Sequence, residues 1–128
     1  MRWLVAFNTL GEDTALAQMN SGKTATVGNY SPPVEGTIKK IAIIVTSVAA
    51  TSLVEGVRVE LESTDWSPNR LEFVVQGSGL RTAPGVQLKP YVYDVTLKMS
   101  KTTPIRGDFI HFSGTPVTSS LVVLFGFD

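Results

Sequence analysis

A repeat of two residues in the hydrophobic pattern limits most strongly what this chain can fold into. In residues 56–63, GVRVELES, the apolar residues Val57, Val59 and Leu61 alternate with charged ones. The same alternation returns in residues 70–77 and 91–100. Successive side chains of a β-strand point to opposite faces of a sheet, so this pattern predicts strands with one buried face. Clusters of Gly, Pro, Asn and Ser between the stretches predict turns.

Two further stretches are apolar on both faces. They are residues 36–48, GTIKKIAIIVTSV, and 119–128, SSLVVLFGFD. Strands of this kind are covered on both sides. In the second stretch Val122 and Leu124 point away from Leu121, Val123 and Phe125, so one of the two sets lies outside the domain's own core unless another segment covers it.

The pattern predicts an all-β fold, an antiparallel eight-stranded jelly-roll-like β-sandwich or barrel. A chain of 128 residues forms one domain by size, here residues 1–128, with residues 1–27 left open as an N-terminal extension or arm. Helical signal is weak, and only 12–19 and 48–56 are candidates for a turn or two of helix. The expected strands are residues 2–7, 23–28, 36–48, 56–63, 70–77, 91–100, 108–114 and 119–128.

The inward-facing residues of these strands define a predicted core. Its members alternate with polar residues or lie in the doubly apolar strands. They are Ile41, Ile43, Val57, Val59, Leu61, Phe73, Val75, Tyr93, Val95, Leu97, Val123 and Phe125.

Charge and cysteine content exclude several classes of protein. Eleven basic and eleven acidic residues cancel, and charged residues make up 17% of the chain, against about 25% in an average soluble domain. The basic residues are scattered, with no basic arm, which argues against sequence-specific nucleic-acid binding. No cysteine is present to form a disulfide or a thiolate metal site. No stretch approaches the roughly 18 apolar residues of a membrane span.

The tripeptide Gly22-Lys23-Thr24 resembles the end of a phosphate-binding P-loop. That motif requires a glycine five residues before the second one, and position 17 is Ala17. The residues after Thr24 include Gly28 and two prolines, which no helix accommodates. We therefore interpret this segment as a polar turn.

No constellation of catalytic residues emerges from the sequence. His111 is the only histidine, and it lies on an alternating strand without clustered carboxylates for a metal site. Glu60 and Glu62 share a strand face, and paired carboxylates can hydrolyse glycosides, but Arg58 stands beside them and a solvated face is the simpler interpretation. We predict no enzyme activity, no catalytic residues, no metal and no cofactor.

The order of the segments resembles a known family. A proline-marked entry, a long apolar strand, a small-residue connection and a second alternating strand follow one another in YSPPVEGTIKKIAIIVTSVAATSLVEGVRVELESTDW. LEFVVQGSGLRTAPG, YVYDVTLKMS and the closing hairpin GDFIHFSGTPVTSSLVVLFGFD complete the series. Over roughly residues 28–128 this order is similar to that of single-jelly-roll capsid proteins of tailless icosahedral viruses of bacteria and archaea.

The resemblance implies a structural protein of the virion, made in the host cytoplasm, whose copies associate into capsomers of an icosahedral shell. The partners would be other copies of the chain, with or without a second coat protein, in the neighbourhood of an internal viral membrane. The alternatives are a carbohydrate- or ligand-binding β-sandwich module and a small hydrolase. The residues that we predict at the subunit interface are Trp3, Trp66, Leu80, Arg81, Val122 and Leu124.

Overall fold

The computed structural model contains eight strands and describes residues 1–8, 24–47, 53–80, 91–111 and 119–128. Side-chain burial is described for residues 1–8, 28–44, 58–75, 91–109 and 121–128. The strands are β1 (Arg2–Asn8), β2 (Thr24–Tyr30), β3 (Gly36–Ser47), β4 (Leu53–Glu62), β5 (Arg70–Leu80), β6 (Tyr91–Met99), β7 (Ile105–His111) and β8 (Ser119–Phe127).

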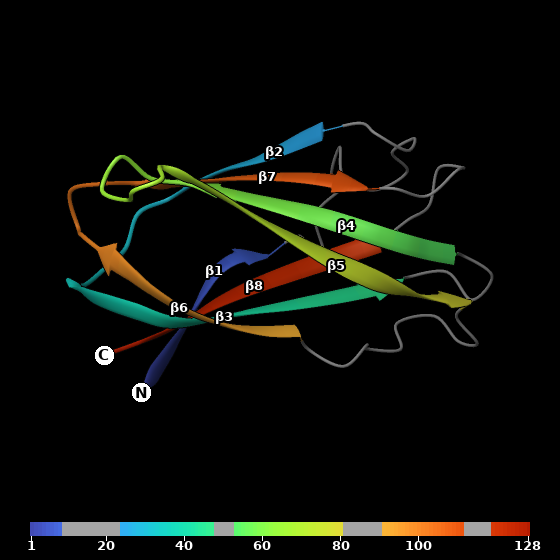
Figure 1. Ribbon diagram of the computed structural model, residues 1–128, viewed down its shortest axis with the longest axis horizontal. Coiled ribbons are helices and arrows are strands. Elements are labelled where there is room, and N and C mark those ends of the chain that lie inside the picture. Colours follow the sequence, from blue (N-terminus) through green and yellow to red (C-terminus); the bar gives the residue numbers. More distant parts are fainter. Residues whose placement is uncertain (9–23, 48–52, 81–90, 112–118) are drawn as a thin grey trace.

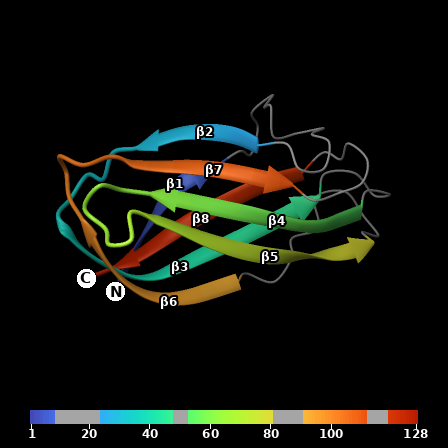
Figure 2. The same ribbon diagram turned by 45° about the horizontal axis from the view of Figure 1, so that its top comes forward.

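The strands form two antiparallel four-stranded sheets packed face to face (Figures 1 and 2). One sheet has the strand order β1-β8-β3-β6 and the other has β2-β7-β4-β5. Except between β4 and β5, the chain crosses to the other sheet at each connection, and this is the jelly-roll arrangement of two Greek keys. The predicted all-β, antiparallel eight-stranded sandwich is confirmed.

Each expected strand is present, with shifts at some ends. Pairing with neighbouring strands extends β5 to Leu80, opposite Leu53, and β7 begins at Ile105, opposite Tyr30. One expectation is wrong in part: residues 53–56 are not helical but begin β4, where Leu53 pairs with Leu80. Strand pairing therefore outweighs the weak helical pattern there. The other helix candidate, residues 12–19, falls outside the described residues.

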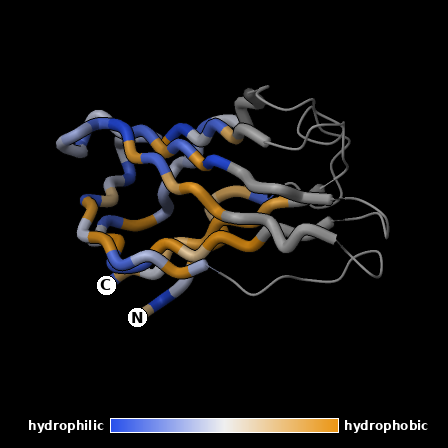
Figure 3. The backbone as a smooth tube through the Cα atoms, turned by 45° about the vertical axis from the view of Figure 1, so that its right-hand side comes forward, coloured by the Kyte–Doolittle hydropathy of each residue, from blue (hydrophilic) through white to orange (hydrophobic). Residues whose placement is uncertain are grey.

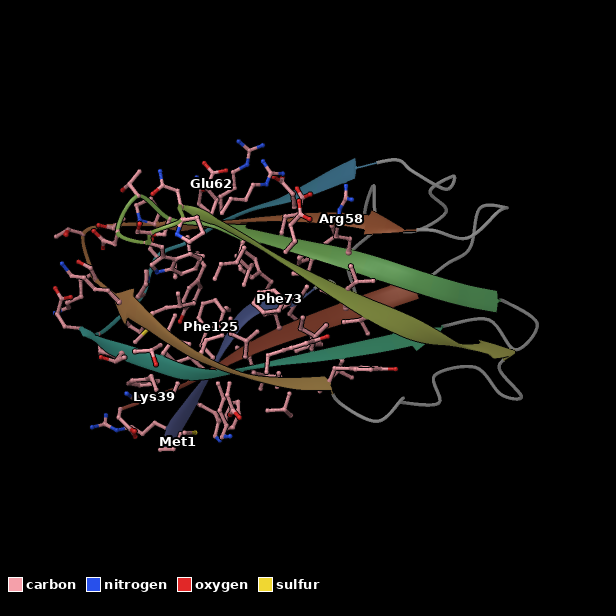
Figure 4. All side chains as sticks on the ribbon, in the orientation of Figure 1. Met1, Lys39, Arg58, Glu62, Phe73 and Phe125 are labelled. Atoms are coloured by element: carbon pink, nitrogen blue, oxygen red, sulfur yellow. The ribbon has the colours of Figure 1, made fainter. Side chains whose placement is uncertain are left out.

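The core lies between the two sheets, as the side chains of Phe73 and Phe125 show in Figure 4. Eight members of the predicted core are buried: Ile41, Ile43, Val59, Leu61, Phe73, Val75, Val123 and Phe125. Tyr93, Val95 and Leu97 are half-buried and pack against this cluster. The Val57 side chain falls outside the described side chains.

An aromatic cluster attaches the N-terminal strand to the core. The Phe7 ring lies 6.2 Å from Tyr30, 6.0 Å from Phe109 and 6.5 Å from Phe125, measured between ring centroids. These contacts join β1 to β2, β7 and β8. Residues 2–8 of the candidate N-terminal extension are thus part of the sandwich. This agrees with the strand expected over residues 2–7.

Candidate assembly surface

A row of apolar side chains crosses the outer face of sheet β1-β8-β3-β6. Strand register places Val5 of β1 opposite Leu124 of β8, Leu124 opposite Ala42 of β3, and Ala42 opposite Val92 of β6. Val5 and Val92 are each 53% exposed, while between them Leu124 is half-buried and Ala42 is buried. Cross-strand neighbours on one face of a sheet touch, so the four residues form a continuous strip.

The strip extends along the two central strands, β8 and β3, and along the edge strand β1. Val122 of β8 lies opposite Ile44 of β3, and both are half-buried. On the other side of the strip, Trp3 is exposed and lies opposite Gly126. A Cβ placed on Gly126 would lie 3.1 Å from two atoms of the indole ring, so the Trp3 ring rests over this glycine. We call these residues the apolar face: Trp3, Val5, Ala42, Ile44, Val92, Val122 and Leu124.

Two ion pairs within the chain lie next to the apolar face. The Lys40 ammonium group lies 2.5 Å from a carboxylate oxygen of Asp94, in the register row beside the strip. The N-terminal amine lies 3.5 Å from the Asp128 carboxylate. The two chain ends accordingly lie side by side at this sheet (Figure 1). Each pair is neutral, so neither leaves a net charge beside the apolar strip.

The outer face of the other sheet has the opposite character. The Glu60 carboxylate is ion-paired with Arg58 at 3.1 Å and with Arg70, and Arg106 lies 3.3 Å from Asp108. Figure 4 shows Arg58 and Glu62 on the outside of this sheet, across the core from Met1 and Lys39. The backbone colouring in Figure 3 shows the same contrast between a more hydrophilic sheet and a more hydrophobic one.

The carboxylates considered for hydrolysis are part of this charged network. Glu60 is buried under the two arginine side chains, and Glu62 lies 3.8 Å from Arg70. Both are therefore engaged by guanidinium groups, a geometry suited to holding strands together. His111 ends β7, and its side chain lies outside the described side chains. No group of three metal-binding side chains occurs within the described part of the chain.

The predicted interface residues have different locations. Trp3, Val122 and Leu124 come together on the apolar face. Trp66 is only 3% exposed and belongs to the core, so it does not contribute to an outer surface. Leu80 ends β5 but its side chain is outside the described ones, and Arg81 is outside the described residues.

Sequence reasoning missed Val5, Ala42, Ile44 and Val92. Val92 shares its strand face with Asp94, Thr96 and Lys98, so the alternation assigns it to a polar surface. Only the register across four strands places Val92 beside Ala42, and so brings it into the apolar strip.

Tyr91 and Tyr93 share a face of β6 but do not form an exposed pair. Tyr93 is half-buried: its ring centroid lies 4.9 Å from that of Phe73, and its hydroxyl donates to the Val74 carbonyl oxygen at 3.2 Å. Tyr91 alone is exposed. A row of exposed aromatic side chains, which a carbohydrate platform requires, is therefore absent from β6.

Replacing Tyr93 with phenylalanine should flatten the loss of stability at alkaline pH. Burial raises the pKa of the Tyr93 hydroxyl above its usual 10.0, and Tyr91 adds to this rise. Above about pH 10 the unfolded chain loses this proton while the folded chain keeps it, so stability falls as the pH rises toward the folded pKa. Melting temperatures followed by circular dichroism between about pH 9 and pH 11 should fall less steeply in Tyr93→Phe than in the wild type. Equal slopes would contradict this assignment.

The arrangement defines the class of the protein as an eight-stranded jelly roll with one apolar and one charged outer face. No protein-family model matches the chain, and no curated protein matches it. Among solved structures, it is similar to the globular domain of zebrafish complement 1qA, with 18% identity over 78% of this chain and 68% of that one and a TM-score of 0.39.

Two other solved structures cover nearly the whole chain. The structure of infectious bursal disease virus Gx strain matches with 13% identity, covering 96% of this chain and 31% of that one, at a TM-score of 0.41. FLHE matches with 16% identity, covering 96% and 90%, at a TM-score of 0.38. TM-scores this low carry no argument about function. As for membranes, the described residues include no helix that is long and apolar enough to span one.

Proposed function

We propose that this protein is a structural subunit that acts by self-association, as a capsid building block of an icosahedral viral shell. The observation that carries the proposal is the apolar face of sheet β1-β8-β3-β6, where Val5 and Val92 are each more than half exposed. Exposed apolar surface of this extent along a sheet is an aggregation hazard for a monomer and a contact surface for a subunit.

Two further features support a subunit of a shell. The chain carries few charges and no net charge, which removes long-range repulsion between copies. The segment order resembles that of single-jelly-roll capsid proteins, whose copies associate through their barrels. A shell subunit needs no cofactor. A companion coat protein is a further partner within this proposal.

A carbohydrate- or ligand-binding module is the second candidate function. It shares the β-sandwich, and a fold alone does not decide between the two. For such a module the exposed Tyr91 is the aromatic side chain on β6 that could contact a ligand, because Tyr93 packs against Phe73 and donates a hydrogen bond to Val74. The assembly experiment below also separates these functions.

Changing Val122 and Leu124 together to lysine should shift the protein to smaller species. Both side chains lie half-buried on the apolar face, and two ammonium groups at its centre oppose burial against another subunit. Lysine stems can lie along the sheet while their charges reach water, so the fold should persist. Sedimentation velocity reports the size of the species, and circular dichroism reports the fold.

The wild-type protein is the reference for this experiment. It should form rings, sheets or particles in the electron microscope as its concentration rises. A wild type that stays monomeric at every concentration and salt tested, alone and with a companion coat protein, would refute the proposed function and favour the ligand-binding module.

A further inference from the structure

All four edge strands of the sandwich carry extra residues relative to the strand they pair with. Ala6 of β1 is the extra residue between the pairs Val5–Leu124 and Phe7–Val123. Val27 of β2 interrupts its pairing with β7 in the same way, and Gly28 beside it has a φ of 114°, which favours glycine. In β5 and β6 two residues lie between consecutive pairs where the partner strand has one.

Aromatic side chains also block carbonyl groups on two of these edges. The Trp66 indole N–H donates to the Lys98 carbonyl oxygen of β6 at 2.9 Å. The Tyr93 hydroxyl of β6 in turn donates to the Val74 carbonyl oxygen of β5, in the other sheet, at 3.2 Å. The first bond joins the β4–β5 connection to β6 and the second joins β6 to β5, and an added strand would have to displace these groups.

These features disfavour association by strand addition. A new strand needs a regular row of unpaired backbone groups, and β-bulges are one of the means by which native sheets avoid edge-to-edge pairing. The charged outer face of sheet β2-β7-β4-β5 already satisfies Glu60 and Asp108 within the chain. The apolar face is the remaining large described surface whose burial would be favourable.

We infer that the partner at the apolar face is a second copy of this chain, packed sheet face against sheet face without joining the sheets into one. The inference rests on the proposed self-association and adds its geometry. Identical faces repel when each has a net charge, but in the register row directly beside the apolar strip Lys40 and Asp94 neutralise each other. The Asp94 side chain is 83% exposed, so its carboxylate can also accept Lys40 of the other copy.

Two exposed valines offer a matched test. Val92 and Val74 both lie on edge strands, at 53% and 59% exposure, but Val92 belongs to the apolar face and Val74 to the outer face of the other sheet. Val92→Lys should weaken self-association by about tenfold or more, since it places a charge in the contact, whereas Val74→Lys should leave it unchanged. Val5→Lys is the second variant, on the opposite edge of the apolar face. Sedimentation velocity at matched concentrations measures the association.

Hydrogen exchange in the assembled protein distinguishes the two packing modes. Face-to-face packing adds no backbone hydrogen bonds, so the outward amides of β1 and β6 should exchange as in Val92→Lys. Strand addition would slow them. A wild type that assembles, yet is dissociated by Val74→Lys and not by Val92→Lys or Val5→Lys, or that protects its edge amides, overturns this inference and leaves the proposed function intact. A wild type that never assembles overturns both.

Discussion

Leu61→Ala should lower the free energy of unfolding by about 2–5 kcal/mol. Leu61 is fully buried on β4, where it lies opposite Leu71 of β5 and Gly107 of β7. Alanine would remove apolar atoms from the centre of the core and leave a cavity that packed sheets cannot fill. Urea unfolding followed by circular dichroism measures the change. A cost below about 1 kcal/mol, the range of surface substitutions, would mean that β4 faces the other way.

Leu97→Ala is the matched control for this measurement. Leu97 also points toward the core but is half-buried, on edge strand β6. Its truncation should cost about 1 kcal/mol, since less apolar surface leaves water and the edge can relax. Equal, large losses of unfolding free energy at both positions would show that the Leu97 side chain is more deeply buried than in this structure.

Gly107→Ala should destabilise the fold by about 1–3 kcal/mol through overpacking. A Cβ at this position would lie 2.9 Å from two atoms of the Phe7 ring. That ring cannot move aside easily, because Tyr30, Phe109 and Phe125 surround it. The free energy of unfolding from urea titrations provides the test.

Gly126→Ala separates this effect from a general cost of replacing strand glycines. A Cβ there would meet the Met1 sulfur at 2.9 Å and the Trp3 ring at 3.1 Å, both in exposed side chains that can shift. The change should therefore cost less than about 1 kcal/mol. If Gly126→Ala proves as damaging as Gly107→Ala, the contact with Phe7 is not the cause.

Local pattern was sufficient to predict the strands because each depends on the chain's own alternation. Val59 and Leu61 face inward and Glu60 outward simply because successive side chains of a strand point to opposite faces. The same rule placed Leu121, Val123 and Phe125 in one set and Val122 and Leu124 in the other. The wrong expectation of helix at residues 53–56 has another cause. The local preference for helix there is weak, and pairing with β5 outweighs it.

The candidate site was predictable only in part, since it is made of residues far apart in sequence. Trp66 could serve equally in a core or at an interface by residue type, and its burial follows from where the connection between β4 and β5 folds. Trp3 and Leu124 meet on one surface only because β1 pairs with β8. No local pattern contains that pairing.

By itself, then, the sequence determined eight strands, their inward and outward faces and the all-β class, because these follow from a period of two within each segment. The tertiary structure decided the rest. The order β1-β8-β3-β6 selects which outward residues become neighbours, and so assembles Val5, Leu124, Ala42 and Val92 into one apolar strip. That choice depends on pairing between distant segments, which is set by how both sheets bury their apolar faces against each other.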